Sequence, residues 1–599
     1  MGDWTVNAGP MLRYDTIDDR DVYHAFALLV TEHARVEDVS VAPVLQYLVG
    51  GGVAGAPLAA VPVRGTAIHV YQDAVSGKAH VFWRFKIECL LTDAPQAVAY
   101  DLPGIHPQRL FQVPARMQNF RWATYSCNGF SSGVDEGAWG GADPLWRDVL
   151  EEHAKSPYHA VVGGGDQIYN DCVGKDPTVA AALQPSAPGK GSTQPLTPEL
   201  VARLDHLFFE NYVKWFGHGA FARAISEIPM VNMLDDHDLI DGFGTYPDDL
   251  MRAPVFNGIG SRGVFWYLLF QQFMCDPHDG ITPGLGYNVN EPATPFRSLI
   301  VGGPGAYIPF PTHNLLTRFG PKQYVLLLDC RAQRKINQVC AQDTYDICFD
   351  ALQRLPHTVE HLVVQLGVPL AYPRMVLLEK MLASNWNPIV WLAKKLMPKF
   401  TNDFNGQVEL LDDLNDHWCA ARHKKERNAF VARTQEVAVD RGVRISFLSG
   451  DVHAGACGVC TWNGGRALTA VSSLHHLKPE RDPKYSVAMV TSAIVNVPPP
   501  APVLAMVNTL AARRHKRRFG THETMIPMFD VIGARNWCSV ELNEATDELL
   551  FDLRVEKEKG SGEVKVYTVK VPPPRFRARH LLRHLTADLR GSDAEEAAA

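Results

Sequence analysis

Five short apolar segments of this 599-residue chain run directly into an acid, a histidine or a cysteine. In α/β proteins, loops converge and ligands bind at the carboxyl ends of buried strands. Five such endings in one chain are difficult to explain as devices for stability alone. The segments, each with the residues that follow it, are Trp122–Gly129, Ala160–Tyr169, Val231–Asp238, Tyr324–Arg334 and Ile445–His453.

The third ending is the densest in charge. Asp235, Asp236, His237 and Asp238 follow one another without a break, and Asp241 comes three residues later. Carboxylates packed this closely at a strand end repel one another and lose hydration unless a cation compensates them. Carboxylate oxygens favour hard or borderline cations, and the imidazole widens the choice toward iron, manganese or zinc. We therefore predict a metal site here.

Two other endings supply further candidate ligands. The three glycines before Asp166 allow a tight turn that leaves its carboxylate projecting, where it can bridge two cations; a plain turn is the alternative. Alternation along an extended segment places Asp451 and His453 on the same side, so that both would face one partner. A pair of surface polar groups is the alternative for these two residues.

The remaining two endings are less specific. Cys127, taken alone after a short apolar run, indicates a buried core residue. Arg331 and Arg334 are three residues apart, so they can lie on one side of a turn and present bidentate donors to a phosphate. An ion pair between Asp329 and an arginine, anchoring the loop, explains the same pattern equally well.

Taken in order, these motifs are similar to those of the PhoD-like branch of the metallophosphoesterases. The series is Ser-Cys at 126–127, Gly-Gly-Asp-Gln-Ile-Tyr at 164–169, Asp-Asp-His-Asp at 235–238, Asp-x-Arg-x-x-Arg at 329–334 and Gly-Asp-Val-His at 450–453. The resemblance covers roughly residues 118 to 540. It implies hydrolysis of phosphate esters, as a phosphodiesterase or phosphomonoesterase, through a metal-activated water.

The resemblance also implies a fold and a set of ligands. The fold is a four-layer α/β/β/α sandwich with an N-terminal β-rich domain, and the site holds iron and calcium, with manganese, zinc or magnesium as alternatives. Cys127 would be the thiolate ligand, Asp166 the bridging carboxylate, Tyr169 the phenolate and Asp451 a further iron ligand. The complete set of expected metal ligands is Cys127, Asp166, Tyr169, Asp235, Asp236, Asp241, Asp451 and His453.

The same resemblance assigns roles in catalysis. His237 would protonate the leaving alkoxide or bind phosphate, and Arg331 would stabilise charge on the phosphoryl oxygens. The expected substrate contacts are Arg331, Arg334 and Asn128. Two positions depart from the usual pattern: Asp241 stands where many members carry asparagine, and Cys330 replaces a threonine.

Hydrophobic periodicity predicts three parts of the chain. Residues 1–115 form a β-rich domain with strands over Ala67–Tyr71 and Lys78–Leu91, and with Val22–Glu32 as its one stretch of helix length. Residues 116–572 alternate short apolar runs with helices and end in a hairpin of Glu548–Val555 and Glu563–Val571. Residues 573–599 are a basic and then acidic tail that we expect to be poorly ordered.

Individual segments of the second part are also predictable. Asp171–Thr197 is rich in glycine, proline and serine, which is typical of a mobile surface loop. The expected buried strands are Tyr158–Val162, Met230–Leu234, Tyr324–Leu328, Leu362–Leu366 and Arg444–Leu448. The expected helices are Pro144–His153, Pro198–Trp215 and Asn428–Arg441.

The charge and the hydrophobic pattern of the chain limit its expected cellular compartment and kinds of binding partner. The net charge of −7 argues against general nucleic-acid binding. No basic stretch followed by an apolar core begins the chain, and no apolar run approaches the roughly 20 residues that span a bilayer. We therefore expect an intracellular, cytoplasmic protein. The basic run Arg513–Arg518 could contact anionic lipid, although a solvated helix face is the simpler explanation.

Three alternatives stay open at this point. A nuclease or nucleotide pyrophosphatase would use the same chemistry, whereas a catalytically silent phosphate- or lipid-binding scaffold would share only the fold. The mutual repulsion of the carboxylates disfavours the scaffold. Ala383–Phe400 predicts a packed helix rather than a membrane anchor, and Cys457 and Cys460 predict buried thiols rather than a metal or redox pair.

Overall fold

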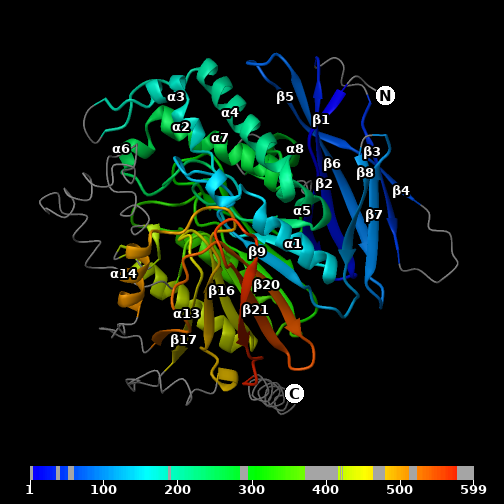
Figure 1. Ribbon diagram of the computed structural model, residues 1–599, viewed down its shortest axis with the longest axis vertical. Helices are drawn as coiled ribbons and strands as arrows, with labels where there is room; N and C mark the ends of the chain where they lie inside the picture. Colours follow the sequence, from blue (N-terminus) through cyan, green and yellow to red (C-terminus); the bar gives the residue numbers. More distant parts are fainter. Residues whose placement is uncertain are drawn as a thin grey trace, which may run out of the picture.

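The chain has a mixed α/β fold with two large β-sheets and a small one (Figure 1). The computed structural model describes residues 4–35, 41–50, 60–104, 106–186, 190–282, 295–370, 416–418, 420, 422–462, 479–511 and 523–576. The predicted segments Ala383–Phe400 and Arg513–Arg518 lie outside these residues, as does most of the tail after residue 572.

The ten-stranded sheet takes strands from both ends of the chain. In spatial order they are β22 (Val564–Val571), β21 (Glu548–Glu556), β20 (Asn536–Asn543), β9 (Trp122–Tyr125), β10 (Ala160–Gly163), β11 (Met230–Asn232), β1 (Trp4–Ile17), β2 (Val22–His33), β6 (Ala79–Leu90) and β5 (Thr66–Gln72). Strands β9, β10, β11 and β1 run parallel to one another, while β20 pairs antiparallel with β9.

The eight-stranded sheet lies entirely in the second half of the chain. Its order is β12 (Leu299–Pro304), β13 (Pro311–Arg318), β14 (Gln323–Leu327), β15 (His361–Leu366), β16 (Arg444–Ser449), β18 (Ser486–Val490), β17 (Ala456–Trp462) and β19 (Glu523–Pro527). Strands β14, β15, β16 and β18 are parallel. The small sheet has the order β4 (Val61–Arg64), β3 (Val44–Val49), β7 (Gln96–Leu102) and β8 (His106–Val113).

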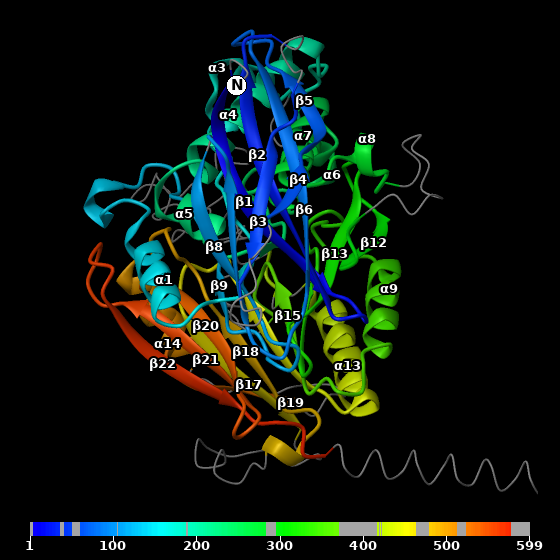
Figure 2. The ribbon, with the colours of Figure 1, turned by 90° about the vertical axis from the view of Figure 1, so that its right-hand side faces the viewer.

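Helices flank both large sheets. The described helices are α1 (Pro144–Lys155), α2 (Cys172–Lys175), α3 (Pro177–Ala182), α4 (Pro198–Phe216), α5 (Gly219–Glu227), α6 (Asp248–Met251), α7 (Pro254–Gln271), α8 (Asp276–Asp279), α9 (Gln342–Gln353), α13 (Lys424–Arg441) and α14 (Ala501–Ala511). Helices α4 and α5 pack against β1, and α9 and α13 lie side by side against the eight-stranded sheet (Figure 2). Within the described part of the chain, no helix is both long and apolar enough to cross a membrane.

Alternation along β14 shows how the two large sheets share a core. Val325 and Leu327 belong to the hydrophobic cluster that also contains Val161 of β10, whereas Leu326 belongs to the cluster under α9 and α13. Successive side chains of a strand point to opposite faces. One face of the eight-stranded sheet therefore packs on the ten-stranded sheet, and the other face packs on helices.

Glycines let the strand ends of the two sheets approach closely. A Cβ atom added to Gly450, which follows β16, would lie 2.5 Å from the Cβ atom of Ser126, which follows β9. One added to Gly367, which follows β15, would lie 2.7 Å from a carboxylate oxygen of Asp235, which comes after β11. The carboxyl ends of parallel strands from both sheets thus converge on one place.

The predicted boundary at residue 115 does not coincide with a break in the ten-stranded sheet. Residues 4–113 are β-rich, but β1, β2, β5 and β6 continue the sheet because β1 pairs in parallel with β11, with Arg13 opposite Met230. Among the described residues before β9, only β3, β4, β7 and β8 form a sheet of their own. Periodicity within a strand carries no information about its distant partner.

Two predictions of local structure were wrong. Val22–Glu32 is not a helix but strand β2, whose residues are mostly buried on both faces between β1 and β6, so the two-residue alternation is lost. Asp171–Thr197 contains the short helices α2 and α3. Asp176 begins α3 by accepting hydrogen bonds from two backbone N–H groups, and it also pairs with Arg203 at 2.6 Å.

The other predicted elements agree with the structure within a few residues. The expected strands correspond to β5, β6, β10, β11, β14, β15 and β16, and the expected helices to α1, α4 and α13. The C-terminal hairpin is β21 and β22, at the edge of the ten-stranded sheet. Cys457 is buried in β17, as predicted, with its Sγ atom 3.4 Å from Met528 Sδ.

We predict that Gly450→Ala destabilises the protein by about 1–3 kcal/mol, because the added methyl group would overlap Ser126 where the sheets meet. Gly450 has no positive φ, so the substitution tests the contact alone. The matched control is Gly137→Ala, whose methyl group would come no nearer than 3.4 Å to Asp135. Thermal unfolding measures both; equal effects of the two substitutions would contradict the close approach.

Candidate metal centre

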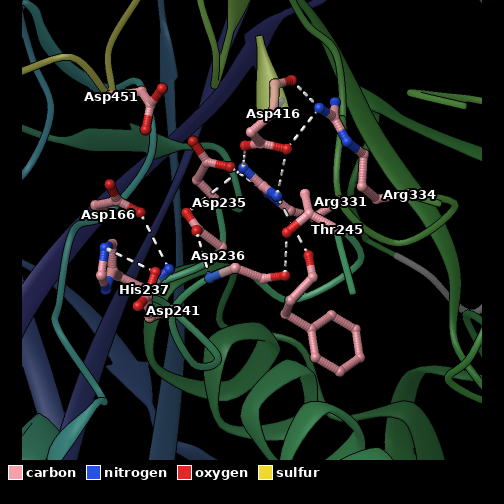
Figure 3. A network of polar contacts seen from close by, with 12 residues as sticks. Asp166, Asp235, Asp236, His237, Asp241, Thr245, Arg331, Arg334, Asp416 and Asp451 are labelled. Carbon is pink, nitrogen blue, oxygen red and sulfur yellow. Dashed lines mark hydrogen bonds and ion pairs between the residues drawn. The ribbon is translucent and has the colours of Figure 1, made fainter. Parts of the chain in front are cut away.

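The predicted ligands lie together beyond the ends of β9, β10, β11 and β16. A group is formed by Asp166, Asp235, Asp236 and His237 (Figure 3). Arg331 lies on the side of this group opposite His237. This convergence follows from the parallel arrangement of the strands, since their carboxyl ends meet at one edge of each sheet.

The core of the site consists of Asp166, Asp236 and His237. One possible ligand atom from each lies within 4.8 Å of those of the other two. Burial, and then the negative charges of Asp235 and Asp236, raise the pKa of the Asp166 carboxyl well above its usual range. One carboxylate oxygen of Asp235 and one of Asp236 are buried without a hydrogen-bond partner. Hard oxygen donors that repel one another and lack protein partners fit a bound cation.

His237 is held in a defined orientation. Its Nδ1 atom lies 2.8 Å from an oxygen of Asp171, and its ring stacks on Tyr169 with 4.2 Å between ring centroids. Its Nε2 atom is 4.0 Å from an oxygen of Asp241. Burial lowers the pKa of His237, but the charges of Asp171 and Asp236 outweigh that effect and raise it well above its usual range.

Cys127 and Tyr169 lie beside Asp166. The Sγ atom of Cys127 is 3.5 Å from an oxygen of Asp166 and 3.1 Å from the hydroxyl of Ser492. Cys127 packs against Tyr169, whose hydroxyl is 3.1 Å from His453 Nε2. Both Cys127 and Asp166 have positive φ values of 55°, so the backbone turns sharply at each strand end. Cys127 is therefore buried, but it is buried at the site.

The residues after β16 have a different geometry from the one predicted. Asp451 and His453 have φ values of 74° and 48°, so the segment is not extended and the alternation that predicted a common side does not apply. An oxygen of Asp451 lies 2.9 Å from Nε2 of His417, while His453 faces Tyr169. Both remain next to the cluster, on two sides of it.

Both arginines pair with buried carboxylates, although Nε and Nη1 of Arg334 are buried without a hydrogen-bond partner. Arg331 bonds to Asp235 through Nε and to Asp416 through Nη1 and Nη2, and Arg334 Nη2 lies 2.5 Å from an oxygen of Asp416. Asp329 instead accepts backbone N–H bonds from the loop after β14 and from β13. The ion pair that was one of the two explanations of this pattern is present, but the acid is Asp416 rather than Asp329.

The side chain of Asn128 makes structural hydrogen bonds in the protein interior. Its side chain is buried, accepts a hydrogen bond from Trp146 Nε1 at 2.7 Å and donates one to the carbonyl of Gln167 at 3.1 Å. Asp241 lies at the edge of the cluster, where its backbone N–H donates to Asp171 at 2.9 Å. Each expected ligand is thus in or beside the cluster, whereas Asn128 points away into the packing under α1.

Sequence reasoning missed several residues that shape the site. Asp171 orients His237, Asp416 holds both arginines and His417 pairs with Asp451. Asp238 accepts hydrogen bonds from the backbone N–H groups of Asp166 and Asp235 and so ties two strand ends together; burial raises its pKa to about 7. Asp238 lies within the recognised Asp-Asp-His-Asp motif, although this role was not predicted for it, and Asp171 follows the motif that ends at Tyr169. Asp416 and His417 lie apart from all five motifs.

Comparison with known proteins agrees with this site. The family model described as PhoD-related phosphatase matches residues 108–387 and 392–528, which is more than half of the chain. The chain belongs to the PhoD-related phosphatases. It is also 34% identical to an uncharacterized protein of Saccharomyces cerevisiae, YGR266W, over 543 residues that cover 82% of this chain and 74% of the yeast protein.

Membership of the PhoD-related phosphatases indicates hydrolysis of phosphate esters. The matched region contains each of the strand endings that carry the candidate ligands, from Cys127 to His453. It begins after β7 and ends before β20, so much of the ten-stranded sheet lies outside it.

We predict that Asn128→Ala lowers stability rather than phosphate affinity. The substitution leaves Trp146 Nε1 and the carbonyl of Gln167 without their buried partner, and each such group costs about 1–3 kcal/mol. Urea unfolding and titration with inorganic phosphate measure the two effects separately. If the variant keeps its stability but binds phosphate more weakly, the prediction is wrong and Asn128 is a substrate contact.

Proposed function

We propose that this protein is a metal-dependent phosphoesterase whose cation is held by Asp166 and Asp236. The observation that carries the proposal is the approach of these two buried carboxylates and His237 to within 4.8 Å. Such a group of acids is unfavourable without a compensating cation. The family match supports the reaction class, and the donor set supports the metal.

The same donors support the iron–calcium centre that the sequence pattern implies. Cys127 and Tyr169 offer sulfur and phenolic oxygen beside Asp166, a combination that suits iron. Asp451 lies on the Asp166 side of the group, away from Arg334 (Figure 3). Asp235, Asp236 and Asp241 offer only oxygen, which suits calcium. His453, held against Tyr169, completes the proposed ligand set. Asp166 lies between the two groups of donors, as a bridging carboxylate must.

We also propose that the layers of the protein form the four-layer α/β/β/α sandwich of the metallophosphoesterases. The two large sheets share one hydrophobic core, α4 and α5 pack on the ten-stranded sheet, and α9 and α13 pack on the eight-stranded sheet. This arrangement leaves the converging strand ends as the place where loops from both sheets can surround a substrate.

The residues of the chain have distinct tasks in this proposal. The bound cations would polarise the phosphoryl oxygens and lower the pKa of an attacking water. Asp171 fixes Nδ1 of His237, so that Nε2 can hold a proton for the leaving oxygen of the ester. Tyr169 supports the imidazole ring from one face. Arg331 lies beside Asp235 and Asp236, next to the negative charge of a bound phosphate.

We predict that Asp166→Asn abolishes cation binding without destabilising the metal-free protein, because it removes one of several repelling charges. In wild type, a hundredfold excess of Mn²⁺ over its dissociation constant should add about 2.7 kcal/mol of stability. Thermal unfolding with EDTA and with Mn²⁺ measures both effects. The control is Asp205→Asn, which breaks the ion pair between Asp205 on α4 and Arg262 on α7 and should keep the full stabilisation by Mn²⁺. A wild-type protein that melts identically with and without cations would refute the metal centre.

We predict that His237→Gln retains Mn²⁺ binding and loses hydrolysis selectively. An alkyl phosphate needs a proton at its leaving oxygen, so its kcat should fall by about 10²–10⁴-fold, whereas 4-nitrophenyl phosphate, with its better leaving group, should be much less affected. Steady-state kinetics with both esters, beside equilibrium dialysis of Mn²⁺, gives the comparison. Loss of Mn²⁺ together with both activities would make His237 a metal ligand instead.

The same assays distinguish the alternative functions. Hydrolysis of bis(4-nitrophenyl) phosphate in preference to the monoester would indicate a phosphodiesterase. Cleavage of nucleic acid that weakens steeply with salt would indicate a nuclease. Mn²⁺ and phosphate binding without turnover of any ester would indicate the scaffold.

A further inference from the structure

Arg331 and Asp236, taken here as a metal ligand, form a long ion pair without a hydrogen bond. The Nη2 atom of Arg331 lies 3.5 Å from an oxygen of Asp236, and that oxygen is buried without a hydrogen-bond partner. Arg331 is itself buried, so its charge is not screened by solvent. A small rotation of the guanidinium would shorten this ion pair to a hydrogen bond and occupy the Asp236 oxygen that a cation would need.

Asp416 binds the end of the Arg331 guanidinium that would otherwise hydrogen-bond to Asp236. Its two carboxylate oxygens accept hydrogen bonds from Nη1 and Nη2 of Arg331, in the bidentate arrangement that is the strongest for this pair of groups. The carbonyl oxygen of Phe243 accepts a further bond from Nη1 at 3.2 Å. With Asp235 on Nε, these bonds hold the guanidinium of Arg331 short of a hydrogen bond to Asp236.

Asp416 is anchored in turn by Arg334. One carboxylate oxygen of Asp416 lies 2.5 Å from Nη2 of Arg334, and the same nitrogen also bonds to the backbone carbonyl of Asp416. Arg334 is completely buried, and its chain lies against Gly244, where a Cβ atom would overlap it. Figure 3 shows the resulting series from Arg334 through Asp416 to Arg331 and the acids beyond.

We propose that Asp416 is a positioning residue that keeps Arg331 from hydrogen-bonding to Asp236 and thereby sets the affinity of the site for its cation. The inference rests on the proposed function, because it takes Asp236 as a metal ligand. Asp416 itself need not contact the cation: it acts by holding the competing positive charge, as residues around the ligands of metal sites commonly do.

The experiment is a comparison of Mn²⁺ affinity, by equilibrium dialysis of the purified chain, among wild type, Asp416→Asn, Asp416→Glu and the double variant Arg331→Met with Asp416→Asn. We expect Asp416→Asn to weaken Mn²⁺ binding by about tenfold or more, because Arg331 then turns to Asp236. Asp416→Glu keeps the charge and should stay within a few-fold of wild type. In the double variant Arg331 no longer competes for Asp236, so affinity should return toward the wild-type value.

Each outcome separates this inference from the metal centre itself. A wild type that binds no Mn²⁺ refutes the proposed centre and, with it, the role of Asp416. A wild type that binds Mn²⁺, with Asp416→Asn unchanged, refutes the role of Asp416 alone. If Asp416→Asn is weak and the double variant is equally weak, the loss is structural and the inference is wrong. Circular dichroism of each variant establishes folding, and Asp205→Asn controls for the loss of one negative charge from an ion pair.

Discussion

The structure depends on the balance of buried charge where the two sheets meet. Asp166, Asp235, Asp236 and Asp238 are almost completely removed from water within one loop cluster. Removing carboxylates from water is costly unless hydrogen bonds or positive charges compensate for the loss. Backbone N–H groups compensate Asp238, and Arg331 compensates one oxygen of Asp235. One oxygen of Asp235 and one of Asp236 nevertheless have no hydrogen-bond partner, and the charges of both acids raise the pKa of Asp166. The buried negative charge that is unfavourable for the metal-free fold is also what makes the site suitable for a cation.

The sheets supply the rigidity that this balance needs. The ligands follow short strands whose side chains are fully buried, and the close contact at Gly450 and Gly367 fixes one set of strand ends against the other. Residues held on the ends of packed strands keep their geometry better than residues on long loops. The second group of contacts, Asp171, Asp416 and His417, comes from loops and holds the side chains rather than the backbone.

The sequence predicted those parts of the site that are local in the chain. Asp166, Asp235 and Asp236 could be found because each follows a short apolar run, and the order of the runs identified the family. Cys127 alone indicated a core residue and was named as a ligand only through the family resemblance. Asp416 and His417 could not be found, because they belong to none of the five motifs and their partners are distant in sequence. The relation of Asp451 to His453 was mispredicted because positive φ values interrupt the strand pattern. Strand β2 was missed as a strand because a central strand buried on both faces lacks alternation.

The placement of β1 affects how the chain can be divided. Strand β1 covers the edge of β11, and β20 covers the edge of β9, so the three short parallel strands that carry Cys127, Asp166 and Asp235 are enclosed by strands from the two ends of the chain. A fragment limited to residues 108–528, the outer bounds of the family match, would lack both covering strands. It would expose two unpaired edges directly beside the candidate metal ligands, and exposed edges of this kind pair with other chains and aggregate. The catalytic unit is therefore larger than the region by which the family is recognised.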